Sequence, residues 1–338
     1  MSAASAGQPA TKRLGVIGSG SIVPFHLDAL KAAGFEIATI GSRAGSEKTV
    51  ALAERYSATA AHDWKAVIAT PGLDALLIAP ETSVTTEILT YALENTELPI
   101  LVEKPISYSS ADLDELAANP AYALRVLVGY NRRQYSSTAA ASAFLAAQGV
   151  SNATFHASIP EASWDPAMAD DRKRGILLAN SVHVLDLLQH LFGELEIAGV
   201  SGVQNDTGLV SRAVSFKSAS GAVGTSIITF GSPSGYFIDL HTPGKSASLK
   251  PIEFFNEYVA VQVIDPTPEV PLRHYVPTRG AEFKLSQDDL DFKPGFLGQS
   301  RELFELASGR TLVGRRSASL ADAAQVLRLA EQLLAAVL

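Results

Sequence analysis

The chain has 338 residues, enough for two domains, and its 47% hydrophobic and 18% charged residues fit a protein with sizeable cores. The net charge of −8 argues against general nucleic-acid binding, and the absence of cysteine excludes disulfides, thiolate catalysis and cysteine-ligated zinc. Residues 1–12 are rich in Ser, Ala and Gly, so we expect a flexible tail there. The chain has no apolar run long enough to span a bilayer, which favours a cytoplasmic protein with no membrane partner.

A glycine-containing turn follows the first predicted strand. Residues 14–17 form an apolar run suited to a buried parallel strand, and Gly18 and Gly20 come directly after it. Gly18 permits a tight turn, and Gly20 lets the backbone approach a pyrophosphate. The helix expected next would direct its N-terminal N–H groups at that phosphate, which makes Ser21 and Ile22 further candidate cofactor-binding residues. The pattern predicts a dinucleotide site.

The second predicted strand, residues 35–40, ends close to Ser42 and Arg43. In NAD-binding folds an acidic residue near this position holds the ribose 2′-hydroxyl. A hydroxyl and a guanidinium suit a 2′-phosphate instead, and no carboxylate stands there to repel it. We therefore expect NADP in preference to NAD. The alternative interpretation of Arg43 is a solvated loop residue.

Three more predicted strands, at 74–79, 99–102 and 125–129, alternate with helices. This alternation predicts an α/β domain over residues 13–127, with the doubly wound parallel sheet of a Rossmann fold. Glu103 and Lys104 stand at the C-terminal end of the strand at 99–102. Ligands of such sheets bind beyond the carboxyl ends of the strands, so we expect both residues to face the cofactor.

The pattern changes in the remaining residues, 128–338. Strand-like stretches and an apolar helical stretch occur there, and two more predicted helices close the chain. The strand-like stretches are 152–159, 211–216, 224–230, 236–240 and 258–264. The helical stretches are 176–192, 300–307 and 320–337. A run of strands after a βα run predicts a second, α+β domain with a mostly antiparallel open sheet.

Several short motifs occur in a specific order along nearly the whole chain. They are Gly18-x-Gly20 with His26, Val102-Glu103-Lys104-Pro105-Ile106, Val128-Gly129-Tyr130, His183-x-x-Asp186 and Gly295-Phe296 before a helix. In these motifs the chain resembles the Gfo/Idh/MocA family of oxidoreductases. The resemblance implies a nicotinamide-binding Rossmann domain, a second domain whose open sheet makes oligomers, and sugars, cyclitols or nucleotide-sugars as substrates. It also implies that Lys104 and His183 lie beside the nicotinamide.

The residue types suit hydride transfer. His183 is the best general base, because the unperturbed pKa of histidine, about 6.5, lies near working pH. Lys104 would stabilise the charge that develops on the reacting oxygen. Asn180 and Asp186 stand three residues before and three after His183, so all three share roughly one side of a helix.

Further candidates have open alternatives. Asn180, Tyr130, Arg132 and Asp186 are candidate substrate-binding residues, although Tyr130 would serve equally well in core packing. The histidines outside the motifs are scattered, so we expect no metal.

One position departs from the family. Many sugar-oxidising members carry an aspartate four residues before the histidine, where this chain has Ala179. Two alternatives to a dehydrogenase therefore stay open: a glycosidase that uses NAD without net redox, and a non-catalytic dinucleotide-binding regulatory protein. We also expect a homodimer or homotetramer that uses the outer face of the second sheet, near Val223, Ile227 and Phe230.

Overall fold

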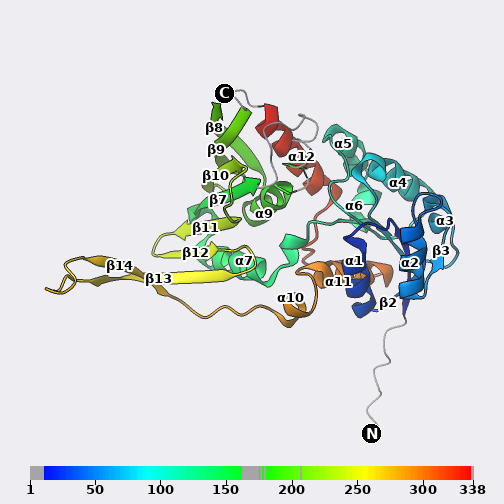
Figure 1. Ribbon diagram of the computed structural model, residues 1–338, viewed down its shortest axis with the longest axis horizontal. Helices are drawn as coiled ribbons and strands as arrows, with labels where there is room; N and C mark the ends of the chain where they lie inside the picture. The colour runs from blue at the N-terminus through cyan, green and yellow to red at the C-terminus, as the bar shows by residue number, and fades with distance from the viewer. Residues whose placement is uncertain (1–10, 162–174, 176, 179, 206–207, 336–338) are drawn as a thin grey trace, which may run out of the picture. The chain divides into compact units, whose positions relative to one another are not determined.

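The computed structural model describes residues 11–161, 175, 177–178, 180–205 and 208–335 (Figure 1). The chain forms two compact units. The first comprises Met1–Gln134 and Asp291–Ala324, and the second comprises Tyr135–Leu290 and Gln325–Leu338. The sequence predicts one boundary after residue 127. The units instead change over after Gln134, and a later segment returns to the first unit.

A six-stranded sheet forms the centre of the first unit. Its strands are β1 (Lys12–Ile17), β2 (Phe35–Gly41), β3 (Thr59–Ala60), β4 (Ala75–Ile78), β5 (Ile100–Val102) and β6 (Val126–Val128). They lie in the order β3-β2-β1-β4-β5-β6, and every neighbouring pair is parallel. Every residue of β4, β5 and β6 is buried, as expected for a sheet covered on both faces. This topology confirms the predicted doubly wound Rossmann sheet.

Helices connect these strands. They are α1 (Val23–Ala32), α2 (Glu47–Tyr56), α3 (Trp64–Ile68), α4 (Thr82–Asn95), α5 (Ala111–Ala118) and α6 (Pro120–Arg125). Side chains fix several of their first turns. The Ser46 hydroxyl accepts the N–H of Thr49 at the start of α2, and the Asp63 carboxylate accepts the N–H of Ala66 at the start of α3.

The returning segment completes the core of the first unit. Its helix α11 (Phe296–Ala307) packs against α1. Leu303 and Phe304 join the core cluster around β1 and β2, and the Phe304 ring meets the Phe35 ring edge-on at 5.4 Å. The Gln299 amide also donates to the Val128 carbonyl at 3.3 Å. These contacts explain why residues 291–324 belong with the first unit.

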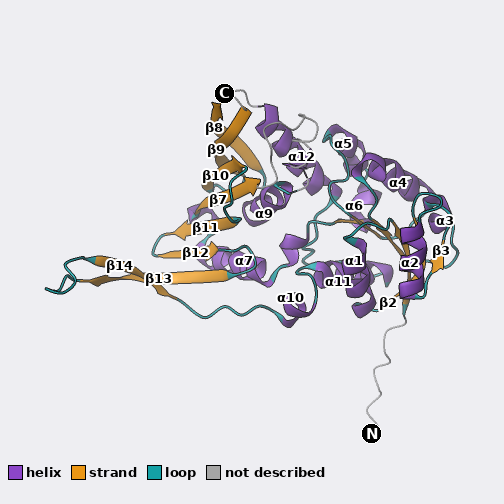
Figure 2. Ribbon diagram, viewed as in Figure 1, coloured by secondary structure: helices purple, strands orange, loops and turns teal. Residues whose placement is uncertain are grey.

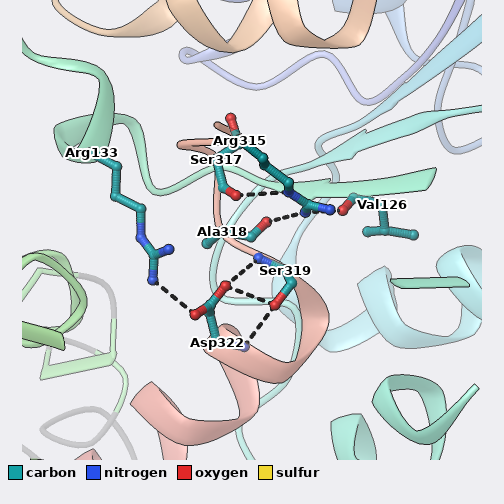
Figure 3. Close-up of polar contacts among 7 residues, drawn as sticks. All are labelled: Val126, Arg133, Arg315, Ser317, Ala318, Ser319 and Asp322. Carbon is teal, nitrogen blue, oxygen red and sulfur yellow. Dashed lines mark hydrogen bonds and ion pairs between the residues drawn. The ribbon is translucent and has the colours of Figure 1, made fainter. Parts of the chain in front are cut away.

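A short stretch after α11 covers the edge of β6. Val128 and Ala318 form an antiparallel bridge, and the Arg315 guanidinium donates to the carbonyls of Val126 and Ala318 (Figure 3). Figure 3 also shows Ser319 and Asp322 bonded to each other at the start of α12 (Leu320–Ala335), with Arg133 beside the Asp322 carboxylate. The stretch therefore satisfies backbone groups at the sheet edge that would otherwise be unpaired.

The second unit contains an eight-stranded sheet. Its strands are β7 (Thr154–Glu161), β8 (Leu195–Asn205), β9 (Gly208–Ser218), β10 (Val223–Phe230), β11 (Phe237–Thr242), β12 (Lys245–Leu249), β13 (Phe255–Ile264) and β14 (His274–Arg279). They lie in the order β14-β13-β12-β11-β7-β10-β9-β8, and only the β7–β10 pair is parallel. This arrangement confirms the predicted mostly antiparallel open sheet.

Helices of the second unit cover one face of this sheet. Figure 2 shows α7 (Ser136–Gln148) and α9 (Val182–Phe192) beside the strands, and the unit also contains two short helices, η2 (Val150–Asn152) and α10 (Gln287–Asp291). Along β10, Gly224, Ser226 and Ile228 are buried, while Val223 and Thr225 are exposed. This alternation indicates a sheet packed on one face only. In the described part of the chain, no helix is both long and apolar enough to cross a membrane.

The last two strands form a projecting hairpin, which we call the β13–β14 arm (residues 259–278). β13 pairs with β12 only between Phe255 and Tyr258, and beyond that point it pairs with β14 alone. Figure 1 shows this yellow hairpin projecting beyond β12. Its side chains include exposed Val261, Val263 and Tyr275, the last 66% exposed. The arm therefore presents an apolar surface unusual for a hairpin in water.

Candidate functional site

The glycine turn after β1 has the predicted conformation. Gly18 has φ 117°, and a Cβ there would lie 2.2 Å from the Ala79 carbonyl oxygen, so no other residue fits. Its N–H donates to the Gly41 carbonyl at 2.8 Å. Gly20 is exposed, and a Cβ there would meet no atom within 4 Å. The turn is thus closed on the protein side and open on the other, which fits the close approach of a pyrophosphate.

The first turn of α1 is suited to an anion. Ile22 occupies the N-cap position with no side-chain cap, and the turn carries no acidic residue. Ser21 is exposed, while Val23 is fully buried in the core. Because no side chain caps the N-terminal N–H groups, they and the helix dipole can serve a phosphate. The residues present therefore fit the phosphates of a dinucleotide.

Ser42 belongs to a chain of hydroxyl groups. Its Oγ lies 2.6 Å from Oγ1 of Thr49, which in turn donates to Oγ of Ser19 at 3.1 Å. This chain links the end of β2, the first turn of α2 and the glycine turn. Because Thr49 gives its proton to Ser19, Ser42 directs its own proton to Thr49 and keeps an acceptor oxygen. Arg43 is exposed beside it, so contact with a 2′-phosphate would fall to that guanidinium.

The sequence did not point to Ser19 or Thr49. Thr49 is buried, and the available signal was its position in the first turn of the helix after the second strand.

The end of β5 holds a connected group of polar residues. The Glu103 carboxylate lies 2.6 Å from Nε2 of His26 through one oxygen, and it accepts the N–H of Lys104 at 3.1 Å through the other. His26 is 1% exposed and Lys104 is half-buried. Glu103, Lys104 and the glycine turn therefore belong to neighbouring parts of one sheet, at the carboxyl ends of its strands.

Burial and charge shift the pKa values of this group. Burial acts to raise the pKa of Glu103, but the hydrogen bond from His26 and the charges of His26 and Lys104 outweigh it and hold this pKa below its ordinary value. Burial lowers the pKa of Lys104; the Glu103 charge opposes this, and the charges of Arg132 and Lys293 add to it. Lys104 thus gives up its proton more readily than a surface lysine, which suits an acid–base or oxyanion role.

Two other candidates of this unit lie after β6. Arg132 is close enough for its charge to act on Lys104, so the structure brings these two residues together. Tyr130 is 1% exposed, which fits the core-packing alternative for that ring. Next to it, the Asn131 amide donates to the Pro294 carbonyl at 3.0 Å and joins this loop to the returning segment.

The second unit holds His183, Asn180 and Asp186 at the start of α9. His183 is half-buried between fully buried Val182 and Val184, and its backbone N–H donates to the Asn180 carbonyl at 3.1 Å. Asp186 is fully buried one turn further on. Asn180 thus precedes α9, whereas His183 and Asp186 lie within it, so the three candidates do not share one side of a helix as their spacing predicts.

A buried carboxylate that the sequence did not indicate lies beside them. Glu161 ends β7 and is fully buried. One of its oxygens accepts the Ser181 hydroxyl, and the other accepts the Asn180 amide at 3.4 Å. Glu161 therefore fixes the side chain of Asn180. Ala179, where many family members have aspartate, lies outside the described residues.

The chain was compared with protein families and with curated proteins. Residues 12–130 match the model of the Gfo/Idh/MocA family, described as an oxidoreductase family with an NAD-binding Rossmann fold. No match was found among curated proteins.

Solved structures resemble the chain over nearly its full length. Levoglucosan dehydrogenase in complex with NADH has a TM-score of 0.75 at 17% identity, covering 96% of each chain. UDP-N-acetylglucosamine 3-dehydrogenase from Acidithiobacillus ferrooxidans has a TM-score of 0.69 at 18% identity, covering 96% of this chain and 97% of that one. An oxidoreductase from Agrobacterium radiobacter, in complex with NAD+, L-tartaric acid and magnesium, has a TM-score of 0.69 at 17% identity, covering 96% and 95%. At such identities the likeness establishes a common fold.

The family match covers the glycine turn, Ser42, Arg43, Glu103, Lys104 and Tyr130. The fold of the chain agrees with that of a dehydrogenase solved with NADH and of an oxidoreductase solved with NAD+. Residues 12–130 therefore match the NAD-binding Rossmann domain of the Gfo/Idh/MocA oxidoreductase family.

Proposed function

We propose that the protein transfers a hydride between a nicotinamide cofactor and the hydroxyl or keto carbon of a sugar, a cyclitol or a nucleotide-sugar. The observation that carries this proposal is the Glu103–Lys104 group at the end of β5, in the same sheet as an open glycine turn. The structurally similar proteins named for levoglucosan and UDP-N-acetylglucosamine support a carbohydrate-like substrate.

Different residues of the first unit would bind the cofactor and act on the reacting oxygen. When bound, the nicotinamide cofactor supplies or accepts the hydride. Gly18, Gly20, Ser21 and Ile22 would hold its phosphates through backbone N–H groups. Lys104, with its lowered pKa, would donate a hydrogen bond to the reacting oxygen and stabilise the charge that develops there.

The second unit would supply the proton acceptor. His183 would take the hydroxyl proton during oxidation and return it during reduction. Asn180, held by Glu161, would hydrogen-bond a substrate hydroxyl. Asp186 would orient the histidine, and Arg132 would bind an anionic group where the substrate has one.

The cofactor preference is a separate proposal. We infer that NADP is preferred, because Arg43 is exposed at the end of β2 and no acidic residue stands next to it in the sequence. We also propose that the chain forms a homodimer or homotetramer through the outer face of the second sheet, where Val223 is exposed and Ile227 and Phe230 are half-buried.

A cofactor titration followed by a substrate panel tests the main proposal. Fluorescence of NADH and NADPH would report binding, and absorbance of the reduced nicotinamide would report turnover with levoglucosan, L-sorbose and UDP-N-acetylglucosamine. We expect tight cofactor binding and net absorbance change with a carbohydrate. Release of a glycosidic leaving group with no net cofactor change would indicate a glycosidase instead. Cofactor binding with no turnover on a wide panel would favour a regulatory protein.

A further inference from the structure

His26 is a buried histidine whose ring has one polar partner among the described residues. It lies in α1, directly after the glycine turn, and its Nε2 is 2.6 Å from the Glu103 carboxylate. Nδ1 is also buried and has no hydrogen-bond partner within the described ranges. Burying a ring nitrogen without a partner costs free energy, so the contact with Glu103 must offset this cost. The histidine is therefore placed for that one contact.

The His26 ring is held in place by α11. Its centroid lies 4.3 Å from that of Phe296, at an interplanar angle of 42°. The Lys293 ammonium lies over two phenyl rings, 5.5 Å from the centroid of Phe296 and 4.9 Å from that of Phe25. The ring is thus fixed by aromatic packing on one side and by the carboxylate on the other.

Glu103 is confined as well. One oxygen meets His26, and the other accepts the backbone N–H of Lys104. On another side, a Cβ at Gly129 would lie 3.2 Å from the Glu103 carboxyl carbon, so only glycine leaves the carboxylate its present position without a shift. The carboxylate therefore connects α1 to the backbone of Lys104.

We propose that His26 is a positioning residue that fixes the Glu103 carboxylate, and through it the backbone and the counter-charge of Lys104. The use of this arrangement in catalysis rests on the proposed function. The arrangement itself rests on the contacts above and is testable in the free protein. It gives the helix that follows the glycine turn a direct structural influence on the lysine.

The charges around Lys104 predict what loss of the histidine does. Among the described residues, the charge of Glu103 acts to raise the pKa of Lys104, and the charges of Arg132 and Lys293 act to lower it. Without the His26 donor, burial would raise the pKa of Glu103 and favour its neutral form. Lys104 would then lose the opposing charge of Glu103, and its own pKa would fall further.

Chemical labelling of Lys104 measures this directly. Acetylation of the free protein is followed across pH, and the rate at Lys104 is read by mass spectrometry against exposed lysines of the same chain. His26→Phe keeps a ring against Phe296 but removes the donor, and His26→Gln keeps a donor but removes the ring. Phe296→Leu is the matched control, because it disturbs the ring packing and leaves the His26–Glu103 contact.

We expect the midpoint of Lys104 labelling to move to lower pH by about 1 unit in His26→Phe, the lower end of the effect of losing a close opposite charge. Glu103→Gln should shift it in the same direction, and the double variant His26→Phe with Glu103→Gln should add little more. His26→Gln and Phe296→Leu should keep the wild-type midpoint. A folded His26→Phe variant with an unchanged labelling midpoint would overturn the proposal. A His26→Gln variant whose midpoint shifts as far as that of Glu103→Gln would also overturn it. If His26→Phe does not fold, His26→Leu replaces it, and the His26→Gln result still decides.

Cofactor titration separates this proposal from the proposed function. If NADH and NADPH both fail to bind the wild-type protein while the labelling shifts occur as expected, the function fails and the positioning role stands. If the cofactor binds and turnover occurs but the midpoint does not move in His26→Phe, the positioning role fails alone.

Discussion

Arg43 carries the proposed preference for NADP. It is exposed at the end of β2, whereas Ser42 directs its proton to Thr49. A charge-assisted hydrogen bond to phosphate contributes about 1.5–3 kcal/mol. Arg43→Ala should therefore weaken NADPH binding by that amount and leave NADH binding nearly unchanged. Fluorescence titration with both cofactors measures this, and an equal loss for both would show that Arg43 does not read the 2′-phosphate.

His183 is the proposed proton acceptor. It lies half-buried at the start of α9, after the Asn180 amide that Glu161 holds. His183→Ala should slow turnover by about 10²–10⁴-fold, the usual range for a general base. Cofactor affinity should stay unchanged, because the dinucleotide contacts belong to the first unit. Single-turnover rates with a substrate from the panel test this, and a near-normal rate would place the base elsewhere.

At the scale of elements, the start of α12 depends on a reciprocal cap. The Asp322 carboxylate accepts the N–H and the hydroxyl of Ser319, both at 2.7 Å, and the Ser319 hydroxyl accepts the N–H of Asp322 at 3.1 Å. Ser319→Ala should lower the free energy of unfolding by about 0.5–2 kcal/mol. Urea denaturation measures this loss. Ser308→Ala is a suitable control, because Ser308 ends α11 and its hydroxyl makes no such reciprocal cap.

Asp322 should also give the stability a dependence on pH. Burial acts to raise its pKa, but the Arg133 charge and the Ser319 hydrogen bonds outweigh it and hold the pKa below the ordinary 3.8. A carboxyl whose pKa is lower when folded stabilises the protein above the unfolded value, and this contribution is lost as pH falls through the folded value. Asp322→Asn should therefore be less stable than wild type at neutral pH, and the difference should shrink below pH 3.8. A difference that stays constant over this range would contradict this assignment.

At the scale of the whole molecule, we propose that the apolar side chains of the β13–β14 arm and of the outer face of the second sheet take part in self-association. The arm has no Lys, Arg, Asp or Glu between Val259 and Ile264, and such charges normally protect an edge strand from pairing. We expect a dimer or tetramer in light scattering at micromolar concentration. Val261→Lys with Val263→Lys should weaken the assembly if the arm takes part. A wild-type monomer under these conditions would contradict the oligomer.

Local pattern predicted both sheets, because buried parallel strands and alternating strands differ in sequence. It also predicted the glycine turn and the place of Lys104 at a strand end. It did not predict the return of α11, because the packing of Phe304 against Phe35 joins residues far apart in the chain. Thr49 and Glu161 were missed for the same reason, since a hydroxyl or carboxylate shows its partner only after folding.

Single-turnover hydride transfer by Lys104→Met tests the central claim most directly. The claim is that Lys104, at the end of β5, acts on the reacting oxygen of a bound substrate. The variant should bind NADH and NADPH as the wild type does, because its target is not the dinucleotide. Its hydride-transfer rate should fall by about 10²–10³-fold, as for the loss of one oxyanion-stabilising group. A folded, cofactor-binding Lys104→Met that transfers hydride at the wild-type rate would contradict the claim.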